Sequence, residues 1–263
     1  MHMETLASPQ NPRVKQWRLL NKSRGERLRQ GLFLAEGEHM AQEAVRTGWA
    51  ATLLTLDERL ERYHDLIEAA RARGTECLAV TRGVLSALSD TKTPQGVLAV
   101  CRLPDLGEAE HASFTVALNG VQDPGNVGTV LRTLDAVGDG RLWIDRDCAD
   151  PFSPKALRAS MGAVFRVPVT AVVDLPARLL TLQSEGATVL AGALDGEPFY
   201  ARPKDGERVC VVIGNEGAGI SPKVLAAAGR RVRLPMHGGA ESLNAAVSCA
   251  VMLYDVLRRR EEA

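Results

Sequence analysis

The chain has few aromatic residues, no net charge and no long apolar stretch. Of its 263 residues, 4% are aromatic, and 32 basic side chains balance 32 acidic ones. A membrane-spanning helix needs about 18 or more consecutive apolar residues, and no stretch approaches that length. The N-terminus is polar and lacks the apolar region of a secretory signal. With a hydrophobic content of 45%, we expect one large or two ordinary domains with cores mainly of Leu, Val and Ala.

Cysteine is scarce and scattered along the chain. No two cysteines form a C-x-x-C pair, and no histidine lies at zinc-binding spacing from one. An odd number without a pattern indicates reduced, buried thiols in a cytoplasmic protein, and it predicts no metal site. The five cysteines are Cys77, Cys101, Cys148, Cys210 and Cys249.

The common signatures of nucleotide binding and hydrolysis are also absent. There is no G-x-x-x-x-G-K-S/T loop, and no G-x-G-x-x-G lies between a strand and a helix with an acidic residue about 20 positions later. The glycine-rich run at 214–219 has a different spacing. G-x-S-x-G and H-E-x-x-H are missing too. These absences argue against a P-loop protein and a Rossmann dehydrogenase.

What the sequence does contain is an alternation of short apolar runs and helical patterns, which is typical of α/β proteins. An acidic, Pro- and Gly-bearing stretch interrupts the alternation, so we place a linker at 104–112. We expect a smaller N-terminal α/β domain at 1–103 and a C-terminal domain at 113–263. The run 209–213 is apolar throughout, as a central parallel strand buried on both faces should be.

Three helix starts are predicted from the local pattern. Asp57 is expected to cap a helix that reaches Ala72. Asn126 or Gly128 is expected to open a second helix, and the last helix is expected at 242–259.

Three polar, glycine-bearing segments stand out in the second half of the chain, at 119–132, 213–221 and 234–244. The second follows an apolar strand, and the other two run into helical patterns. Loops after parallel strands gather at the carboxyl ends of the strands, where α/β proteins bind ligands. The three segments therefore predict a single binding site.

Five polar residues in these segments are candidates for chemistry. Asn126 is either a helix cap or a site residue. Arg132 is a surface cation or, if it lies within an apolar helix face, a cation that needs a partner. Glu216 is either a turn carboxylate or a partner for Arg132 or a substrate hydroxyl. Capping explains one of Ser242 and Asn244 but not both, because Asn244 is expected just inside the helix, where its propensity is poor.

The N-terminal segment between residues 13 and 29 is strongly basic, with Glu26 as its one acid. Such a segment is either a solvated helix face or a contact for a phosphate backbone. Trp17 within it is either a stacking surface or a packing anchor. The basic residues are Arg13, Lys15, Arg18, Lys22, Arg24, Arg27 and Arg29.

The three segments resemble the motifs of the SpoU (TrmH-type) group of the SPOUT superfamily of RNA ribose 2′-O-methyltransferases. The matching stretches are 126–133, 213–221 and 234–244, and the stretch 154–168 resembles the segment that the family has between them. The N-terminal half is similar to the family's L30e-like RNA-binding domain through the shorter stretches 8–12 and 33–37.

The resemblance implies a C-terminal trefoil-knotted α/β domain on a parallel sheet, a homodimer, and S-adenosylmethionine as the cofactor. Knots are very rare, and the periodicity alone does not predict one. The cofactor contacts that the resemblance implies are Gly214, Asn215, Gly217, Leu234, Met236, Ser242 and Leu243.

In the mechanism that the resemblance implies, Arg132 activates the ribose hydroxyl. An arginine is effectively always protonated, so we favour electrostatic stabilisation of a developing alkoxide, with a substrate phosphate taking part. Asn126, Glu216, Ser242 and Asn244 would position Arg132 and the ribose.

The appended N-terminal domain favours 23S ribosomal RNA as substrate. The alternatives are transfer RNA, a non-catalytic RNA-binding assembly factor, and a resistance methylase with the same chemistry.

Overall fold

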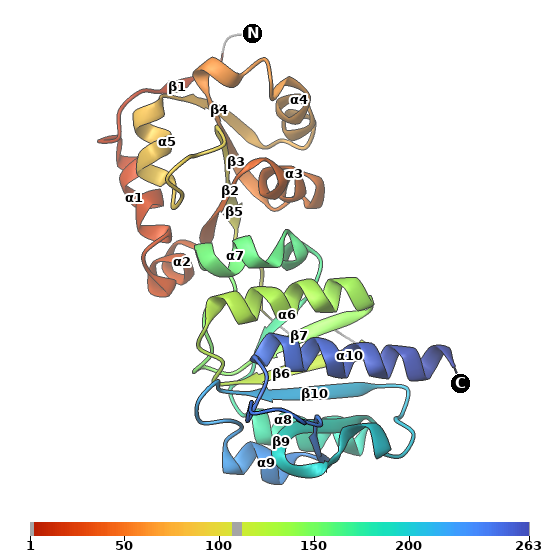
Figure 1. Ribbon diagram of the computed structural model, residues 1–263. Helices are drawn as coiled ribbons and strands as arrows, with labels where there is room; N and C mark the ends of the chain where they lie inside the picture. The colour runs from red at the N-terminus through yellow and green to blue at the C-terminus, as the bar shows by residue number, and fades with distance from the viewer. Residues whose placement is uncertain (1–2, 107–111, 263) are drawn as a thin grey trace. The chain divides into compact units, whose positions relative to one another are not determined.

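The computed structural model describes residues 3–106 and 112–262 of the chain. They form two compact units (Figure 1). Unit 1 is Met1–Asp105 with Phe152–Phe165, and unit 2 is Leu106–Pro151 with Arg166–Ala263. The first division lies inside the linker expected at 104–112, of which 107–111 lie outside the described residues. The grouping of 152–165 with unit 1 was not expected from the sequence.

Unit 1 contains a mixed sheet with the strand order β1-β4-β3-β5-β2. β3 is parallel to β4 and antiparallel to β5, and β5 is antiparallel to β2. The strands are β1 (Thr5–Leu6), β2 (Leu32–Glu36), β3 (Ala50–Leu56), β4 (Glu76–Val80) and β5 (Val97–Arg102). The helices are α1 (Pro12–Leu20), α2 (Arg24–Gln30), α3 (Glu38–Thr47), α4 (His64–Ala72), α5 (Arg82–Leu88) and α7 (Pro154–Ser160), with the 3-10 turns η1 (Asp57–Arg59) and η2 (Ala163–Phe165).

An aromatic cluster attaches the segment 152–165 to the rest of unit 1. The ring of Phe33, on β2, lies 5.1 Å from that of Phe152 and 6.0 Å from that of Phe165, measured between centroids. Trp49 meets Phe165 edge to face at 5.4 Å. Arg158 of α7 also pairs with Asp90. The core of unit 1 therefore includes residues that are distant in sequence from the N-terminal half.

Unit 2 contains an all-parallel sheet with the strand order β11-β9-β10-β6-β7-β8. The strands are β6 (Phe114–Asn119), β7 (Gly140–Ile144), β8 (Val169–Ala171), β9 (Thr188–Pro198), β10 (Val209–Gly214) and β11 (Arg230–Arg233). The helices are α6 (Pro124–Val137), α8 (Leu175–Ser184), α9 (Pro222–Ala227) and α10 (Ala245–Glu261), with the 3-10 turn η3 (Phe199–Ala201). β10 lies inside the sheet and is buried from Val209 to Ile213, which confirms the prediction of a central strand.

Helices cover both faces of this sheet (Figure 1). On one face, α8 and α9 pack on alternate residues of the strands, such as Cys210 and Val212 of β10. On the other face, α6 and α10 lie side by side, and α10 packs on β10. Successive side chains of β10 point to opposite faces of the sheet, so one alternate set packs against α8 and α9 and the other faces α6 and α10. No helix of the described residues is long and apolar enough to cross a membrane.

The three predicted helix starts are wrong in position. Asp57 begins a 3-10 turn, and α4 starts only at His64. α6 starts at Pro124, capped by Asp123, whose side chain accepts a hydrogen bond from Gly125 N at 2.6 Å. Proline suits this first helical position because it has no N–H to leave unpaired. α10 starts at Ala245 and not at residue 242.

Candidate functional site

A tight turn follows β10. The backbone N–H and C=O groups of Asn215 and Gly219 bond each other reciprocally, both at 2.9 Å. The Asn215 carboxamide oxygen accepts hydrogen bonds from Gly217 N and Ala218 N, also at 2.9 Å. A Cβ atom on Gly214 would lie 2.3 Å from backbone atoms of Gly219 and Ile220. Residue 214 must therefore be glycine for the turn to close.

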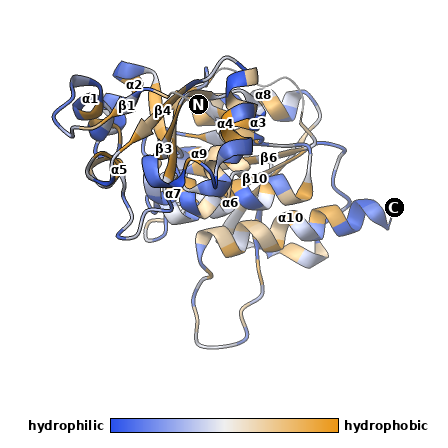
Figure 2. Ribbon diagram, turned by 90° about the horizontal axis from the view of Figure 1, so that it is seen from above, coloured by the Kyte–Doolittle hydropathy of each residue, from blue (hydrophilic) through white to orange (hydrophobic). Residues whose placement is uncertain are grey.

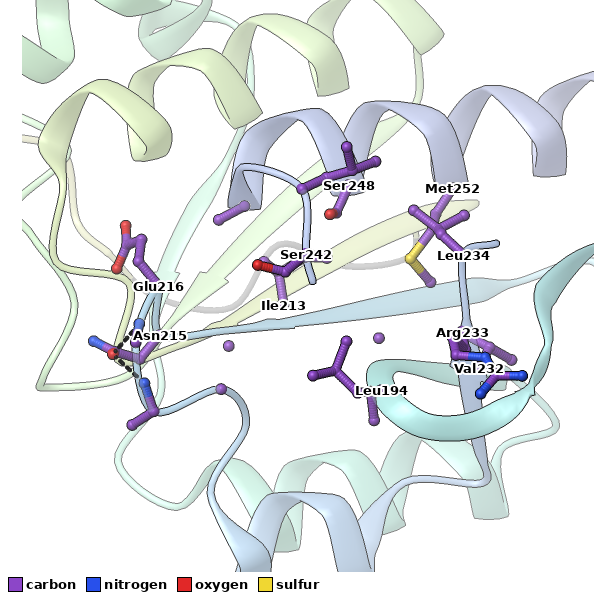
Figure 3. A pocket seen from close by; sticks show the side chains of 18 of the residues that line it. Leu194, Ile213, Asn215, Glu216, Val232, Arg233, Leu234, Ser242, Ser248 and Met252 are labelled. Carbon is purple, nitrogen blue, oxygen red and sulfur yellow. Dashed lines mark hydrogen bonds between the residues drawn. The ribbon is translucent and has the colours of Figure 1, made fainter. Parts of the chain in front are cut away.

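This turn forms one wall of a pocket of about 270 Å³ at the carboxyl ends of β10 and β11, next to the middle of β9 (Figure 3). Asn215 and Glu216 lie at one end of the pocket and Arg233 lies at the other, with Ser248 and Met252 of α10 on a third side. The lining residues that the sequence predicted as cofactor contacts are Gly214, Asn215, Gly217, Leu234, Met236, Ser242 and Leu243. The structure therefore brings all seven predicted contacts to one cavity.

Two walls of this pocket were not predicted from the sequence. One is the stretch 192–194 of β9, and the other is the face of α10 that carries Ala245, Ser248 and Met252. Their spacing of three and four residues places these side chains on one side of a helix, and this periodicity was available in the sequence. The stretch 192–194 follows an apolar run, as the predicted loops do, but it carries no polar signal.

Glu216, Asn126 and Asn244 form a continuous chain of hydrogen bonds that joins the three predicted segments. Asn126 Nδ2 donates to Glu216 Oε1 at 2.8 Å. Asn244 Nδ2 donates to Asn126 Oδ1 at 2.9 Å. Asn244 Oδ1 in turn accepts from the backbone N–H groups of Ala246 and Val247 at the start of α10. The Asn126 amide thus uses both of its ends to connect the other two segments.

The Glu216 carboxylate also accepts hydrogen bonds from the backbone N–H groups of Gln122 and Asp123, both at 3.2 Å. Burial raises the pKa of Glu216, but the hydrogen bonds from Asn126 and from backbone N–H groups outweigh burial and hold the pKa below its ordinary value. A carboxylate next to the N-terminus of α6 is also favoured by the dipole of that helix.

The structure decides between alternatives that the sequence left open, and it shows that some predictions are wrong. Arg132 is exposed on α6 rather than set in its apolar face, and it forms no hydrogen bond or ion pair with the described residues. Glu216 binds Asn126 rather than Arg132. Asn126 is not the cap of α6, whereas Asn244 is the cap of α10 and lies just outside it. Ser242 lines the pocket but is not part of the helix.

In the basic segment of unit 1, some cations are buried or paired with acidic residues, and others are exposed without a partner among the described residues. Arg27 is buried and donates to the Leu20 carbonyl, so it is not available to a ligand. Arg13 pairs with Glu76, and Arg29 pairs with Glu26. Trp17 is buried in the core and is therefore a packing anchor rather than a stacking surface. The cations exposed without a partner among the described residues are Lys15, Arg18 and Lys22, and Arg24 is half-buried.

The five cysteines are free thiols, as expected, and Cys77 is half-buried while the other four are buried. Burial raises the pKa of Cys148 and of Cys210 to about 12, so both are unreactive thiols near neutral pH. The residues that the structure describes contain no group of three or more His, Cys, Asp or Glu side chains placed to hold a metal ion.

Comparison with known proteins identifies the family. Residues 113–254 match the SpoU rRNA methylase family. The chain belongs to this family. Residues 11–99 match the MRM3-like substrate binding domain. The family resemblance and the expected fold class are thereby confirmed, with a mixed sheet in the N-terminal part and an all-parallel sheet in the C-terminal SPOUT part. The knot itself stays a prediction.

Individual known proteins are similar to almost the whole chain. The Bacillus subtilis 23S rRNA (guanosine(2553)-2'-O)-methyltransferase RlmP is 35% identical, covering 96% of this chain and 98% of its own. An AdoMet-bound rRNA methyltransferase structure from Sinorhizobium meliloti is 30% identical with a TM-score of 0.84 and covers 97% of both chains. By contrast, a structure concerned with 2-OH methylation of C/U34 on tRNA covers 58% of this chain, with 29% identity and a TM-score of 0.52.

Proposed function

We propose that this protein transfers a methyl group from S-adenosylmethionine to a ribose 2′-oxygen of 23S ribosomal RNA. The observation that carries the proposal is the hydrogen-bond chain Glu216–Asn126–Asn244, which joins three distant segments beside one pocket. A protein that only binds RNA through its surface has no need of such a connection. Two relatives that match almost the whole chain are named as rRNA methyltransferases.

The pocket fits the proposed cofactor in its chemistry. Its walls combine backbone of the 214–219 turn with the apolar side chains of Leu234, Leu243 and Met252, which suits a flat nucleoside with polar edges. Glu216 supplies a negative charge at one end of the pocket (Figure 3). In this proposal the residues that hold the cofactor are the seven predicted contacts together with Ser248 and Met252.

The bound cofactor supplies an activated methyl group on a sulfonium. The protein's own task is to align the ribose hydroxyl and to ease the loss of its proton. Arg132 is an exposed cation without a partner among the described residues, so its guanidinium is available for a developing alkoxide or an adjacent phosphate. The Glu216–Asn126–Asn244 chain holds the N-terminal turn of α6 in place. Arg132 lies on the same helix, about two turns further along.

The share of this chain that each relative matches favours ribosomal RNA over transfer RNA as the substrate. The tRNA-related structure matches little more than half of this chain, whereas the rRNA relatives match both domains. The MRM3-like substrate binding domain and the exposed cations of unit 1 would then contact the RNA.

The proposal includes a homodimer in the cytoplasm. α10 has an exposed side with Val247 and Tyr254, 47% and 50% exposed, next to α6. Figure 2 shows that α10 is mainly hydrophobic until its basic last turn. A second copy of the chain would cover this surface. Val247→Asp should then convert the protein to a monomer in sedimentation analysis.

The test is transfer of labelled methyl from S-adenosylmethionine to undermodified 23S ribosomal RNA and, separately, to transfer RNA, followed by nuclease mapping. Label on a ribose of 23S RNA supports the proposal and names the nucleotide. Label only in transfer RNA would contradict the proposed substrate but would support the proposed methyl transfer. Cofactor binding without label in either RNA would favour a non-catalytic assembly factor.

A further inference from the structure

The last residue of β6 connects the loops that follow its two neighbouring strands. β6 lies between β10 and β7 in the sheet. Asn119 Nδ2 donates to Asp145 Oδ2, just beyond β7, at 2.7 Å. On the other side, Asn119 Oδ1 accepts from the backbone N–H of Ser221, at the end of the loop that follows β10, also at 2.7 Å. One amide therefore spans three adjacent strand ends.

Asp145 fixes this amide in place. It is 9% exposed, and its other oxygen accepts from the backbone N–H groups of Gly120 and Asp147, both at 3.1 Å. A carboxylate oxygen accepts and a backbone N–H donates, so Asn119 can satisfy both neighbours in one orientation only. The hydrogen bonds of Asp145 thus determine which end of Asn119 faces Ser221.

The loop held in this way is the wall of the pocket. At its start, Asn215 Nδ2 donates to the Gly120 carbonyl at 2.8 Å. At its end, the Ser221 N–H is held by Asn119. Neither Asn119 nor Asp145 lines the pocket itself. Their hydrogen bonds instead determine where the turn at 214–219 stands relative to β6.

We propose that Asn119, oriented by Asp145, is a positioning residue that holds the 214–221 loop in the conformation that binds the cofactor. This inference rests on the proposed function of the pocket as an S-adenosylmethionine site. It assigns a role to a residue that begins the first polar segment and that the mechanism above does not use.

The reciprocal exchange of the two side chains provides a sharp test. Asn119→Asp places two carboxylates against each other and should weaken S-adenosylmethionine binding by about tenfold to a hundredfold. In the double variant with Asp145→Asn, the amide at 145 can donate to the carboxylate at 119. That carboxylate still accepts from Ser221 N, while the amide oxygen at 145 still accepts from Gly120 N and Asp147 N. Binding by the double variant should return to within about threefold of the original value.

The measurement is calorimetric titration of each full-length variant with S-adenosylmethionine, at a temperature where circular dichroism shows it folded. Asp174→Ala is the matched control, because it removes the α8 cap bond to Ala177 N without touching these loops, and it should bind normally. Unchanged affinity in Asn119→Asp, or no recovery in the double variant, overturns the inference. Failure of the original protein to bind S-adenosylmethionine overturns the proposed function instead.

Discussion

The loops around the pocket of unit 2 and the basic segment of unit 1 are both polar, but they use their polar groups differently. In unit 2, the Asn126 amide bonds Glu216 and Asn244, which lie 90 and 118 positions away in the chain. In unit 1, Lys15, Arg18 and Lys22 point to solvent without a partner among the described residues. The function proposed for the loops of unit 2 depends on the geometry of specific hydrogen bonds. The function proposed for the basic segment of unit 1 depends on the total charge of its cations.

This difference has a consequence for mutagenesis. A connected site loses its function when one member is removed, because each remaining partner loses a hydrogen bond that holds it in position. A charged surface loses affinity gradually, because each cation contributes separately to attraction of a phosphate backbone. Single substitutions should therefore be decisive at the pocket and weak in the basic segment.

The largest effect is expected from Arg132→Ala. Loss of the cation should lower methyl transfer by about a thousandfold or more. Because Arg132 is exposed and unpaired within the described residues, the free energy of unfolding should change by less than about 0.5 kcal/mol. The measurements are single-turnover methyl transfer and calorimetric cofactor binding. Loss of cofactor binding in this variant would show that Arg132 has a structural role.

The next effect is expected from Asn126→Leu. This change removes one partner each from Glu216 and Asn244, and it should lower the free energy of unfolding by about 1–3 kcal/mol. Urea denaturation measures the change. Thr129→Ala on the same helix, where the hydroxyl bonds only the Gly125 carbonyl, serves as control. Equal effects of the two substitutions would contradict a special role for the hydrogen-bond chain.

In the basic segment, a pair of substitutions should act where single ones do not. Replacing Lys15 and Arg18 with Ala should lower the slope of RNA affinity against salt concentration by about 1.5 on logarithmic axes, since each lost phosphate contact removes ~0.7–0.9. The control replaces Arg13 and Arg29, which pair with acids, and should change the slope less. An unchanged slope in the variant without Lys15 and Arg18 would show that these residues do not contact the RNA backbone.

The smallest effect is expected from pH at Glu216. Its pKa is lower in the folded protein than the ordinary 4.5, so its contribution to stability is complete above that value and is lost as the pH falls through the folded-state pKa. The difference in melting temperature between the original protein and Glu216→Gln should therefore be constant near neutral pH and shrink below 4.5. A difference that persists in acid would mean that the charge of Glu216 is not what the hydrogen bonds stabilise.

Much of the fold could be predicted because local patterns agree with it. The apolar run 209–213, predicted as a central strand, is the buried strand β10. The errors arose at helix starts. Asp123 and Asn244 are the caps of α6 and α10, but polar residues are common near such junctions, and propensity does not distinguish the cap from its neighbours.

The sequence by itself determined the family, the alternation of strands and helices, and two of the segments that line the pocket, 213–221 and 234–244, because these depend on residue types and spacings within short stretches. Only the tertiary structure decided which polar groups meet. It paired Glu216 with Asn126 rather than with Arg132, buried Arg27, and placed the Asn119 amide between Asp145 and Ser221. A hydrogen bond requires two groups within about 3 Å, and for segments a hundred residues apart that distance is set by the packing of the whole sheet.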